Sequence, residues 1–419
     1  MKTSLSDWYE MEKRRIVAKC RECGLCARKC PIVPKTDLIN HKPIAIQSAV
    51  KKFLAEGCES DIVRTRAFSC MECFGCCEGV CPEGLDPLRV HEIIKHEFRR
   101  KNPDTFPRYD TRDPNLTHRI LASIQVTAAE YRRIFTPKTP PNTRRVFFPG
   151  CNVYFQPEKI LNALDVLAAV DPEIAFLPGL DGCCGDCHVW YGDPDRADAV
   201  SDDLLEKVAA VNPETLILWC PTCQCRLEKT LAPVKRPGAE IVSLPQFLSR
   251  NLDKLPISRK NGRSVTLHEA CKASLTGLDP EGPRPILAAV GARLTEMDRH
   301  GKNAACCGSG TIEKFPDACR QMRDERLAEA GGTGADTLVT VCHFCNQLFH
   351  TAPGRQPFQV ENYINILAHA MGIEREDKFR KYAHWADQIR IMADARPLIA
   401  ASPFSKEQIA QTIARVFVA

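Results

Sequence analysis

Cysteine is the residue type that could do chemistry in this sequence, and it occurs 23 times in 419 residues. Two N-terminal runs contain closely spaced cysteines: CRECGLCARKCP from residue 20 and CMECFGCCEGVCP from residue 70. A C-x2-C-x2-C-x3-C-P run suits a [4Fe–4S] cluster, whereas a zinc site needs four ligands and rarely a third C-x2 step. The spacing therefore predicts two cubane clusters. The candidate ligands are Cys20, Cys23, Cys26, Cys30, Cys70, Cys73, Cys76, Cys77 and Cys81.

The second run holds one cysteine too many for a single cube. The C-x2-C-x2-C head selects Cys76 as third ligand, and the C-x3-C-P tail selects Cys77. We favour Cys76, because the tight head is the part that wraps three corners of a cube. Paired runs of this kind commonly exchange their last cysteines, so we expect Cys81 to complete the first cluster and Cys30 the second.

A different cysteine pattern occurs twice after residue 145, each time with two adjacent cysteines followed by glycine. The copies read C-x31-CC-x35-C-x2-C and C-x34-CC-x34-C-x2-C. Adjacent thiolates cannot easily take two corners of one cube, because one short backbone link joins them, but they suit a cluster with a bridging thiolate. A vicinal disulfide or a zinc ribbon is the alternative. The two sets are Cys151, Cys183, Cys184, Cys220 and Cys223, then Cys271, Cys306, Cys307, Cys342 and Cys345.

Glycine and histidine lie beside these adjacent cysteines. Gly182, Gly185, Gly308 and Gly310 let the backbone approach a cluster and point amide N–H groups at its sulfides. Histidine can carry protons near neutral pH, so we predict proton delivery by the three histidines within four residues of a cluster cysteine. Alternatively, each hydrogen-bonds a cluster sulfur or packs beside it. These histidines are His188, His268 and His343; Cys58, Cys187, Cys225 and Cys319 fall outside every pattern and receive no role.

The elements that position these cysteines differ between the two halves of the chain. Apolar residues at helical spacing predict a helix within 41–57, and Asp86 with Pro87 predicts the start of another. We therefore expect a helical domain over 1–105 that carries both N-terminal runs. A linker over 106–144 comes next, because the prolines of TPKTPPNTRR favour an extended backbone.

Short strand patterns alternate with helical patterns from residue 145, and the whole order is repeated. This alternation predicts two α/β domains, over 145–262 and 263–372, with cysteines at the strand ends. A helical tail over 373–419 ends in a helix whose capping box joins Ser405 to Gln408. The apolar face of that helix is expected to pack on its own domain or, alternatively, to dock a partner.

Composition and charge narrow the possible functions. With 44% hydrophobic residues, the chain can bury hydrophobic cores without disulfides. No leader segment is recognisable, so we expect a cytoplasmic protein whose cysteines are reduced metal ligands. No stretch approaches the roughly 20 apolar residues of a membrane span. Membrane association would come only through a partner, at the inner face of the cytoplasmic membrane. A net charge of +5, with 57 basic and 52 acidic residues, gives little support for nucleic-acid binding.

The duplicated cysteine pattern resembles the CCG domain of the heterodisulfide reductase family. Residues 10–105 resemble the α-helical ferredoxin module of that family and of succinate dehydrogenase, and residues 10–370 resemble the fused catalytic subunit. The resemblance implies a non-cubane [4Fe–4S] cluster on each five-cysteine set. It also implies reduction of a small-molecule disulfide between the two clusters, each giving one electron to one sulfur.

A rival interpretation comes from the iron–sulfur subunits of glycolate, glycerol-3-phosphate and lactate dehydrogenases, which share this layout and only conduct electrons. Those relatives often lack part of the final C-x2-C, whereas CPTC and CHFC are intact here and favour two complete clusters. A redox sensor or scaffold would be a third interpretation, but no DNA-binding element is recognisable. No flavin or nucleotide fingerprint occurs either. We therefore expect a redox partner: a flavin-bearing electron-bifurcating subunit, a membrane cytochrome b or a flavoprotein dehydrogenase.

Overall fold

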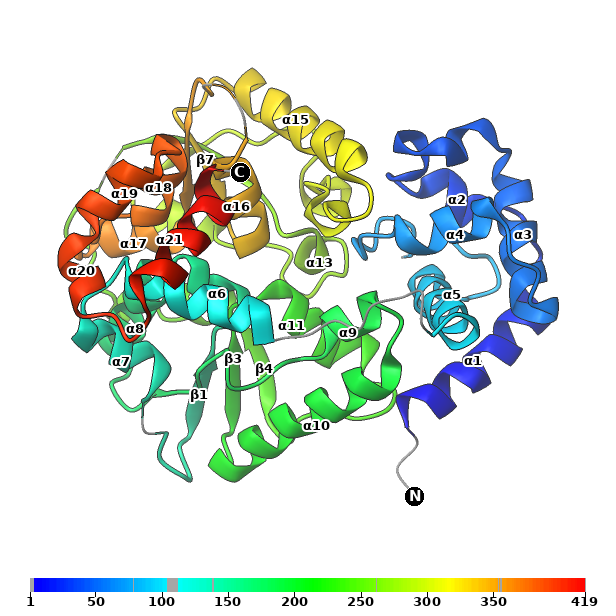
Figure 1. Cartoon of the computed structure of the whole chain (residues 1–419), viewed down its shortest axis with the longest axis horizontal. Coiled ribbons are helices and arrows are strands. Elements are labelled where there is room, and N and C mark those ends of the chain that lie inside the picture. The colour runs from blue at the N-terminus through cyan, green and yellow to red at the C-terminus, as the bar shows by residue number, and fades with distance from the viewer. Residues whose placement is uncertain are drawn as a thin grey trace.

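The computed structural model describes residues 4–77, 79–103, 112–137, 139–260, 262–352, 354 and 356–418. Figure 1 shows a helical module on one side, two α/β repeats, and C-terminal helices on the side away from the module. The predicted fold class, a helical ferredoxin-like module followed by two α/β repeats, is confirmed. Within the described ranges, no helix combines the length and apolar character that a membrane crossing requires.

The helical module consists of short helices joined by the cysteine-bearing loops. Its core includes the stacked rings of Phe53 and Phe98, whose centroids are 4.5 Å apart. The predicted helix start at Asp86 is confirmed, because its carboxylate accepts a hydrogen bond from the Leu88 N–H at 2.9 Å. The helices are α1 (Leu5–Lys19), α2 (Leu25–Lys29), α3 (Pro43–Glu56), α4 (Asp61–Phe68) and α5 (Pro87–Lys101), with 3-10 turns η1 (Val33–Lys35) and η2 (Asp37–Asn40).

The first repeat contains a four-stranded parallel sheet in the order β2-β1-β3-β4. Its strands are β1 (Arg145–Phe148), β2 (Ala175–Phe176), β3 (Thr215–Leu218) and β4 (Glu240–Ser243). The helices α8 (Pro157–Val170), α10 (Pro194–Val211) and α12 (Leu244–Ser249) connect or follow them. Crossover helices of this kind bury parallel strands, which explains why LIL of β3 is entirely buried.

The second repeat has the same topology, with parallel strands in the order β6-β5-β7-β8. Its strands are β5 (Ser264–His268), β6 (Arg293–Leu294), β7 (Thr337–Thr340) and β8 (Gln359–Asn362). The helices are α14 (Arg284–Ala289), α15 (Pro316–Gly332) and α17 (Tyr363–Ala370). Phe148 pairs with Leu218 and His268 pairs with Thr340, so Phe148 and His268 occupy equivalent positions.

The two repeats pack against each other reciprocally. The helix of the first C-x2-C, α11 (Pro221–Cys225), contacts α13 (Cys271–Ser274), which starts at the first cysteine of the second repeat. Conversely, α16 (His343–His350), beside the second C-x2-C, contacts η3 (Asn152–Phe155), which follows Cys151. The cysteine-bearing ends of the two sheets therefore face a common interface.

The range 106–144 is not the extended linker that the prolines predict. Residues 104–111 lie outside the described residues, but α6 (Arg112–Ser123) and α7 (Ala128–Phe135) occupy most of the segment between residues 112 and 137. Their apolar residues are helically spaced, and Leu121 and Ile124 are buried in a cluster with the helical tail. The prolines of 139–141 lie in irregular backbone only after α7 has ended.

The helical tail packs over α6 on the chain's own surface. The capping box of Ser405 and Gln408 is confirmed, and Ile409, Ile413 and Phe417 are buried beside α6. The apolar face of the last helix is therefore already covered within the chain. The tail comprises α18 (Lys378–Trp385), α19 (Gln388–Asp394), α20 (Arg396–Ala400), α21 (Lys406–Ile413) and the π-helical turn η8 (Ala414–Val418).

Candidate metal centre

One set of cysteines, the outer cysteine group, lines a cavity at the surface of the helical module: Cys20, Cys23, Cys26 and Cys81. Gln47 of α3 reaches into this group. The Cys26 thiol donates to Gln47 Oε1 at 3.1 Å, and Gln47 Nε2 donates to Cys20 Sγ at 3.6 Å. The contact of Gln47 with these cysteines was not predicted. The only sequence feature that could have indicated it is a polar residue on the buried side of an amphipathic helix.

A second set, the inner cysteine group, lines a neighbouring cavity: Cys30, Cys70, Cys73 and Cys76, with Cys77. The thiol of Cys30 lies within hydrogen-bonding reach of Cys76. Cys30 thus lies with the second run and Cys81 with the first, which is the arrangement that the expected exchange requires. Cys76 contacts both Cys30 and Cys77, whereas Cys77 also faces the start of α5 at Leu88.

Arg66 of α4 lies between the two groups and is 1% exposed. Burial lowers the pKa of its guanidinium, but Cys30, Cys76 and Cys26 outweigh this effect and raise the pKa overall. A fixed positive charge at this position stabilises thiolates on both sides. Sequence spacing gave no signal for Arg66, because it is 40 residues from Cys26, whose carbonyl accepts its Nη2–H at 3.5 Å.

The five cysteines of the first repeat gather at the carboxyl ends of β1 and β3. Cys184 lies within hydrogen-bonding reach of Cys183 and Cys223, and Cys220 within reach of Cys223. Gly150, at φ +80°, precedes Cys151; a Cβ there would lie 2.6 Å from Cys220 Cβ. Glycine is therefore required at position 150 so that the backbone at Cys151 can approach the final C-x2-C.

The second repeat reproduces these contacts. Cys307 Sγ lies 3.1 Å from Cys345 Sγ, and the Cys271 thiol lies 3.6 Å from Cys306 Sγ. Ligand atoms of His268, Cys307 and Cys345 all lie within 4.8 Å of one another. The pair Cys307–Cys345 corresponds to Cys184–Cys223 in the first repeat.

These thiols fit a bound cationic cluster. Hydrogen bonds from Cys306 and Cys345 lower the pKa of Cys307 well below its usual value, and Cys183 and Cys223 do the same for Cys184. Burial raises the pKa of Cys151 to about 12. So many buried thiols within hydrogen-bonding reach of one another favour a site where metal replaces the thiol protons.

Two of the four predicted glycines direct amides at sulfur. The N–H of Gly185 points at Cys183 Sγ and that of Gly308 at Cys306 Sγ, each at 3.4 Å. Both glycines have φ near +85°, which explains the need for glycine. The other two serve packing: a Cβ on Gly182 would meet Leu204, and one on Gly310 would meet Trp190 and Met71.

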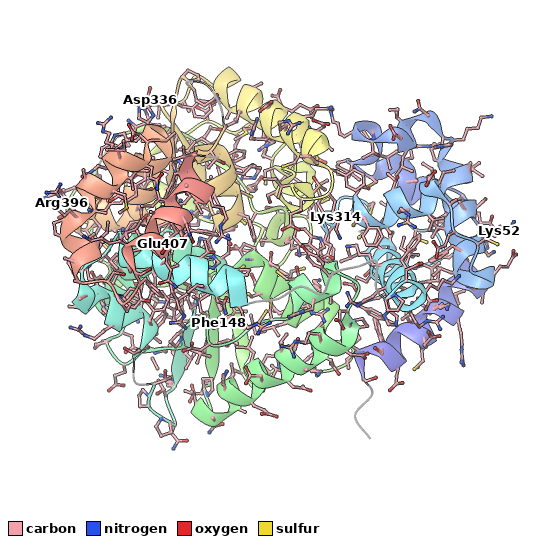
Figure 2. All side chains as sticks on the ribbon, viewed as in Figure 1. Lys52, Phe148, Lys314, Asp336, Arg396 and Glu407 are labelled. Carbon is pink, nitrogen blue, oxygen red and sulfur yellow. The ribbon has the colours of Figure 1, made fainter. Side chains whose placement is uncertain are left out.

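Burial lowers the pKa of all three predicted histidines. His268 lies beside Cys307, and its Nδ1 accepts a hydrogen bond from Arg326 Nε at 3.3 Å, which makes Nε2 the protonated nitrogen of the neutral ring. In the first repeat the equivalent residue is Phe148, labelled in Figure 2. His343 packs edge-on to Trp219 with a pKa lowered to about 3. His188 is buried in α9 (Asp186–Trp190). Proton delivery by any of them stays a prediction.

The helical module meets the second repeat at a cysteine. Cys306 lies within hydrogen-bonding reach of Cys73, so the inner cysteine group and the second-repeat set are in direct contact. Beside this contact, Lys272 Nζ lies 2.8 Å from Asp186 Oδ2 and 3.3 Å from Glu72 Oε2. Glu72 also pairs with Lys95 at 3.3 Å. This buried ion network ties together the segments that bear three of the cysteine sets.

A cavity of about 100 Å³, the junction cavity, opens where the module and both repeats meet. Figure 2 places Lys314 at this boundary. Its Nζ lies 4.5 Å from the Phe68 ring centroid and 4.7 Å from that of Tyr191. The lining residues include Phe68, Lys95, Cys187, Trp190, Tyr191, Ser309, Lys314 and Phe344.

The four cysteines without a predicted role lie apart from one another. Cys187 lines the junction cavity, Cys225 is buried near Lys272, Cys319 is buried beneath Gly308, and Cys58 is exposed. Three of them lie near predicted ligand cysteines: Cys187 near Cys183, Cys225 near Cys271, and Cys319 near Cys307.

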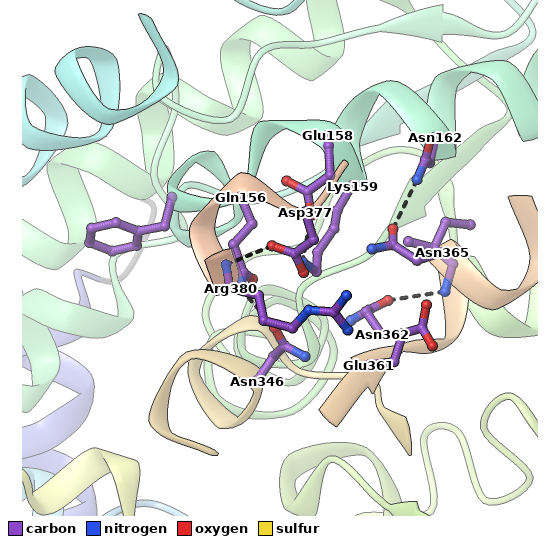
Figure 3. Close-up of polar contacts among 12 residues, drawn as sticks. Gln156, Glu158, Lys159, Asn162, Asn346, Glu361, Asn362, Asn365, Asp377 and Arg380 are labelled. Carbon is purple, nitrogen blue, oxygen red and sulfur yellow. Dashed lines mark hydrogen bonds and ion pairs between the residues drawn. The ribbon is translucent and has the colours of Figure 1, made fainter. Parts of the chain in front are cut away.

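A separate polar cluster fastens the helical tail to both repeats. Figure 3 shows Glu158 and Lys159 of α8 facing Asp377, with Asn346 of α16 nearby. Lys159 Nζ lies 2.6 Å from Glu158 Oε1 and 3.0 Å from Asp377 Oδ2, and Asn346 accepts from Gln156 at 2.7 Å. This cluster holds α16, next to the second C-x2-C, in place.

Family comparisons agree with this division of the chain. The profile of the CCG cysteine-rich domain matches residues 145–228 and 265–349, and that of a 4Fe-4S dicluster domain matches residues 19–86. The chain therefore contains one dicluster domain and two CCG domains, and it is an iron–sulfur electron-transfer protein.

Three known proteins are similar to this chain over part of its length. An uncharacterised iron–sulfur protein of Methanococcus maripaludis is 22% identical over 348 residues, covering 78% of this chain and 67% of that protein. A probable membrane-anchored ferredoxin of Chromohalobacter salexigens is 23% identical, over 51% of this chain and 34% of that protein. EtfAB:quinone oxidoreductase of Syntrophomonas wolfei is 22% identical, over 48% of this chain and 30% of that protein. The chain spans about a third of the length of the latter two.

Proposed function

We propose that this chain, with its dicluster domain and two CCG domains, is the catalytic iron–sulfur subunit of a heterodisulfide-reductase-like complex. It reduces a small-molecule disulfide with electrons from a redox partner. The clusters, when bound, supply single electrons. The outer and inner cysteine groups would hold two cubane [4Fe–4S] clusters, and the two five-cysteine sets two non-cubane ones. The chain would work in the cytoplasm or against the cytoplasmic membrane through that partner.

The junction cavity is the observation that carries disulfide reduction. Its wall from the first repeat includes Cys187 and Trp190, close after the Cys183–Cys184 pair, and its wall from the second includes Ser309. The Cys307 thiol donates to the Ser309 hydroxyl at 3.4 Å. A substrate in this cavity would therefore lie between the two adjacent-cysteine motifs, as cleavage of one S–S bond by both sites requires.

The cavity also offers groups that bind and protonate. Trp190, Tyr191 and Phe344 provide apolar walls, while Lys314 provides an ammonium group. Burial, followed by the charge of Lys95, lowers the pKa of Lys314 to about 8. Reduction of a disulfide consumes two electrons and two protons and gives two thiols. Lys314 can give a proton near neutral pH, and solvent can supply the second.

The test is turnover of a panel of low-molecular-weight disulfides by anoxic protein with a chemical reductant, with released thiols counted. Roughly sixteen iron atoms per chain would accompany four loaded clusters. Lys314→Met should slow thiol release at pH 7, with iron content unchanged. Fully loaded protein that releases no thiol from any disulfide would overturn the proposal.

A conduit role for a flavoprotein dehydrogenase is the second candidate. The direct contact of Cys73 with Cys306 favours it, because the inner cysteine group then leads directly into the second repeat. In that case the first repeat would be a side branch. Cys184→Ala would leave electron transfer from a flavoprotein intact, while Cys307→Ala would interrupt it.

A further inference from the structure

The proposed function requires a redox partner, and the surface of the helical module indicates its chemistry. We propose that the surface around Cys23 docks an acidic electron-donor protein. We call this region the Cys23 surface: Lys19, Cys23, Arg28, Lys29, Lys42 and Ile44. The inference rests on the proposed electron-transfer role, but it concerns a different part of the molecule from the junction cavity.

Cys23 marks the place where a predicted cluster site reaches solvent. It is exposed, whereas every other predicted ligand cysteine is buried or half-buried. The outer cysteine group to which it belongs lies on the helical module, at the opposite side of the molecule from the helical tail (Figure 1). A protein docked on Cys23 would thus stand next to a metal site without entering the interior.

Ile44 gives this surface an apolar centre. A Cβ on Gly24 would lie 2.4 Å from the Pro43 carbonyl carbon, so the Cys23 loop rests directly on the start of α3. That contact places Ile44 beside the loop, where its side chain is 57% exposed. The helical periodicity of α3 does not account for an isoleucine left in solvent. Protein interfaces typically combine an apolar centre with a polar rim.

The rim is basic, and most of its charges are unpaired. Residues 19–52 contain eight basic and two acidic residues, although the whole chain has a net charge of only +5. The acids nearest Cys23 are already paired, Glu22 with Lys51 at 3.1 Å and Glu83 with Arg21 at 2.8 Å. In the described part of the chain, Lys19, Arg28, Lys29 and Lys42 make no ion pair.

An acidic protein fits these features better than an acidic lipid surface. Unpaired bases steer an oppositely charged partner and orient it on contact. A lipid headgroup would satisfy the charges but would bring no electrons to the exposed cysteine. The surface also connects inward, because Arg66 links Cys26 to Cys30 and Cys76, and Cys73 in turn touches Cys306.

The experiment measures binding of anoxic protein to immobilised acidic plant-type ferredoxin as a probe, across a series of salt concentrations. The affinity should fall at least tenfold between low and high salt, because the contact is between charges. The triple variant Arg28→Glu, Lys29→Glu, Lys42→Glu should bind at least tenfold more weakly. Ile44→Ser should weaken binding without changing its salt dependence.

Arg396→Glu is the matched control, because Arg396 is exposed and lies at the opposite end of the molecule in Figure 2. It should bind as the unmodified protein does. Equal binding by the triple variant and the control, or no binding to ferredoxin, overturns the proposal. So does salt-sensitive binding to phosphatidylglycerol vesicles without binding to ferredoxin. Failure of the proposed function would instead appear as loaded protein that binds ferredoxin but reduces no disulfide.

Discussion

Lys272 should be among the most important residues for holding the three parts of the chain together. Its ammonium lies 2.8 Å from Asp186 and 3.3 Å from Glu72, and the three side chains are 12%, 11% and 1% exposed. Lys272→Met would leave Glu72 with Lys95 but would leave Asp186 buried without its cation. Burial already raises the pKa of Asp186 to about 7, even with Lys272 present. The variant therefore forces this carboxyl to take up a proton or remain charged without compensation.

Removal of one partner from a buried ion pair destabilises proteins by about 3–5 kcal/mol. Because Asp186 can take up a proton, we expect the lower end, about 3 kcal/mol. For a cooperative unit of one repeat and its contacts, this corresponds to a fall in Tm of about 6 °C or more. Differential scanning calorimetry of the anoxic protein measures it. The double variant Lys272→Met, Asp186→Asn should recover at least half of the loss, because the uncompensated carboxylate is then gone.

Lys207→Met is the matched control. Lys207 pairs with Asp203 one helical turn away, with side chains 39% and 55% exposed, and exposed pairs of this kind contribute about 0.3–0.5 kcal/mol. Its Tm should change by less than about 2 °C. A Tm of Lys272→Met that matches this control would refute the reasoning that the buried network joins the parts.

Three further predictions rest on local geometry. Gly185→Ala and Gly308→Ala each add a Cβ to a backbone at φ near +85°, 2.6 Å from Ala197 O in the first case and 3.0 Å from Met322 Cβ in the second. Each variant should therefore lower the iron content by about four atoms per chain. The control Gly182→Ala meets only a Leu204 methyl group and should retain its iron. Cys81→Ser should alter the electron paramagnetic resonance signal of the outer cysteine group and not that of the inner group, since Cys81 lines only the outer cavity. Burial lowers the pKa of His118 to about 4, below its unfolded value of about 6.5. As the pH falls from about 6.5 toward 4, the unfolded chain binds a proton at His118 that the folded protein does not. The contribution of His118 to stability is therefore present above about pH 6.5 and is lost over this range. His118→Phe should therefore reduce the loss of stability between pH 7 and pH 5 by about 2 kcal/mol, and an unchanged loss in calorimetry would contradict this.

The fold was largely predictable because its signals are local. Alternating strand and helix patterns gave both α/β repeats, and Asp86 and Ser405 marked helix starts that the structure confirms. The prolines of 136–145 misled the linker prediction, because they come after α7 instead of replacing it. The helices before them have buried faces, such as Leu121 and Ile124, that pack on a tail more than 250 residues away in sequence.

The candidate site also has features that the sequence predicted and features that it did not. Cysteine spacing grouped the thiols that the structure brings together, including the exchange of Cys30 and Cys81 between runs. The charged groups around them were not predictable. Arg66 meets the distant Cys26, and Lys272 pairs with Glu72 and Asp186 from two other parts of the chain. The histidine pKa values depend on burial, which a sequence does not display. The junction cavity exists only because three parts of the chain meet there.

The central claim is that both repeats act on one disulfide, and paired variants test it most directly. Cys184 and Cys307 each contact the final C-x2-C of their own repeat, so Cys184→Ala and Cys307→Ala should each disrupt one site and leave the other intact. With iron content and spectroscopy to show which cluster is lost, thiol release from the best disulfide is measured for each variant. The account predicts that either variant alone loses nearly all disulfide reduction. Substantial reduction by either variant, with its cluster demonstrably absent, would contradict it.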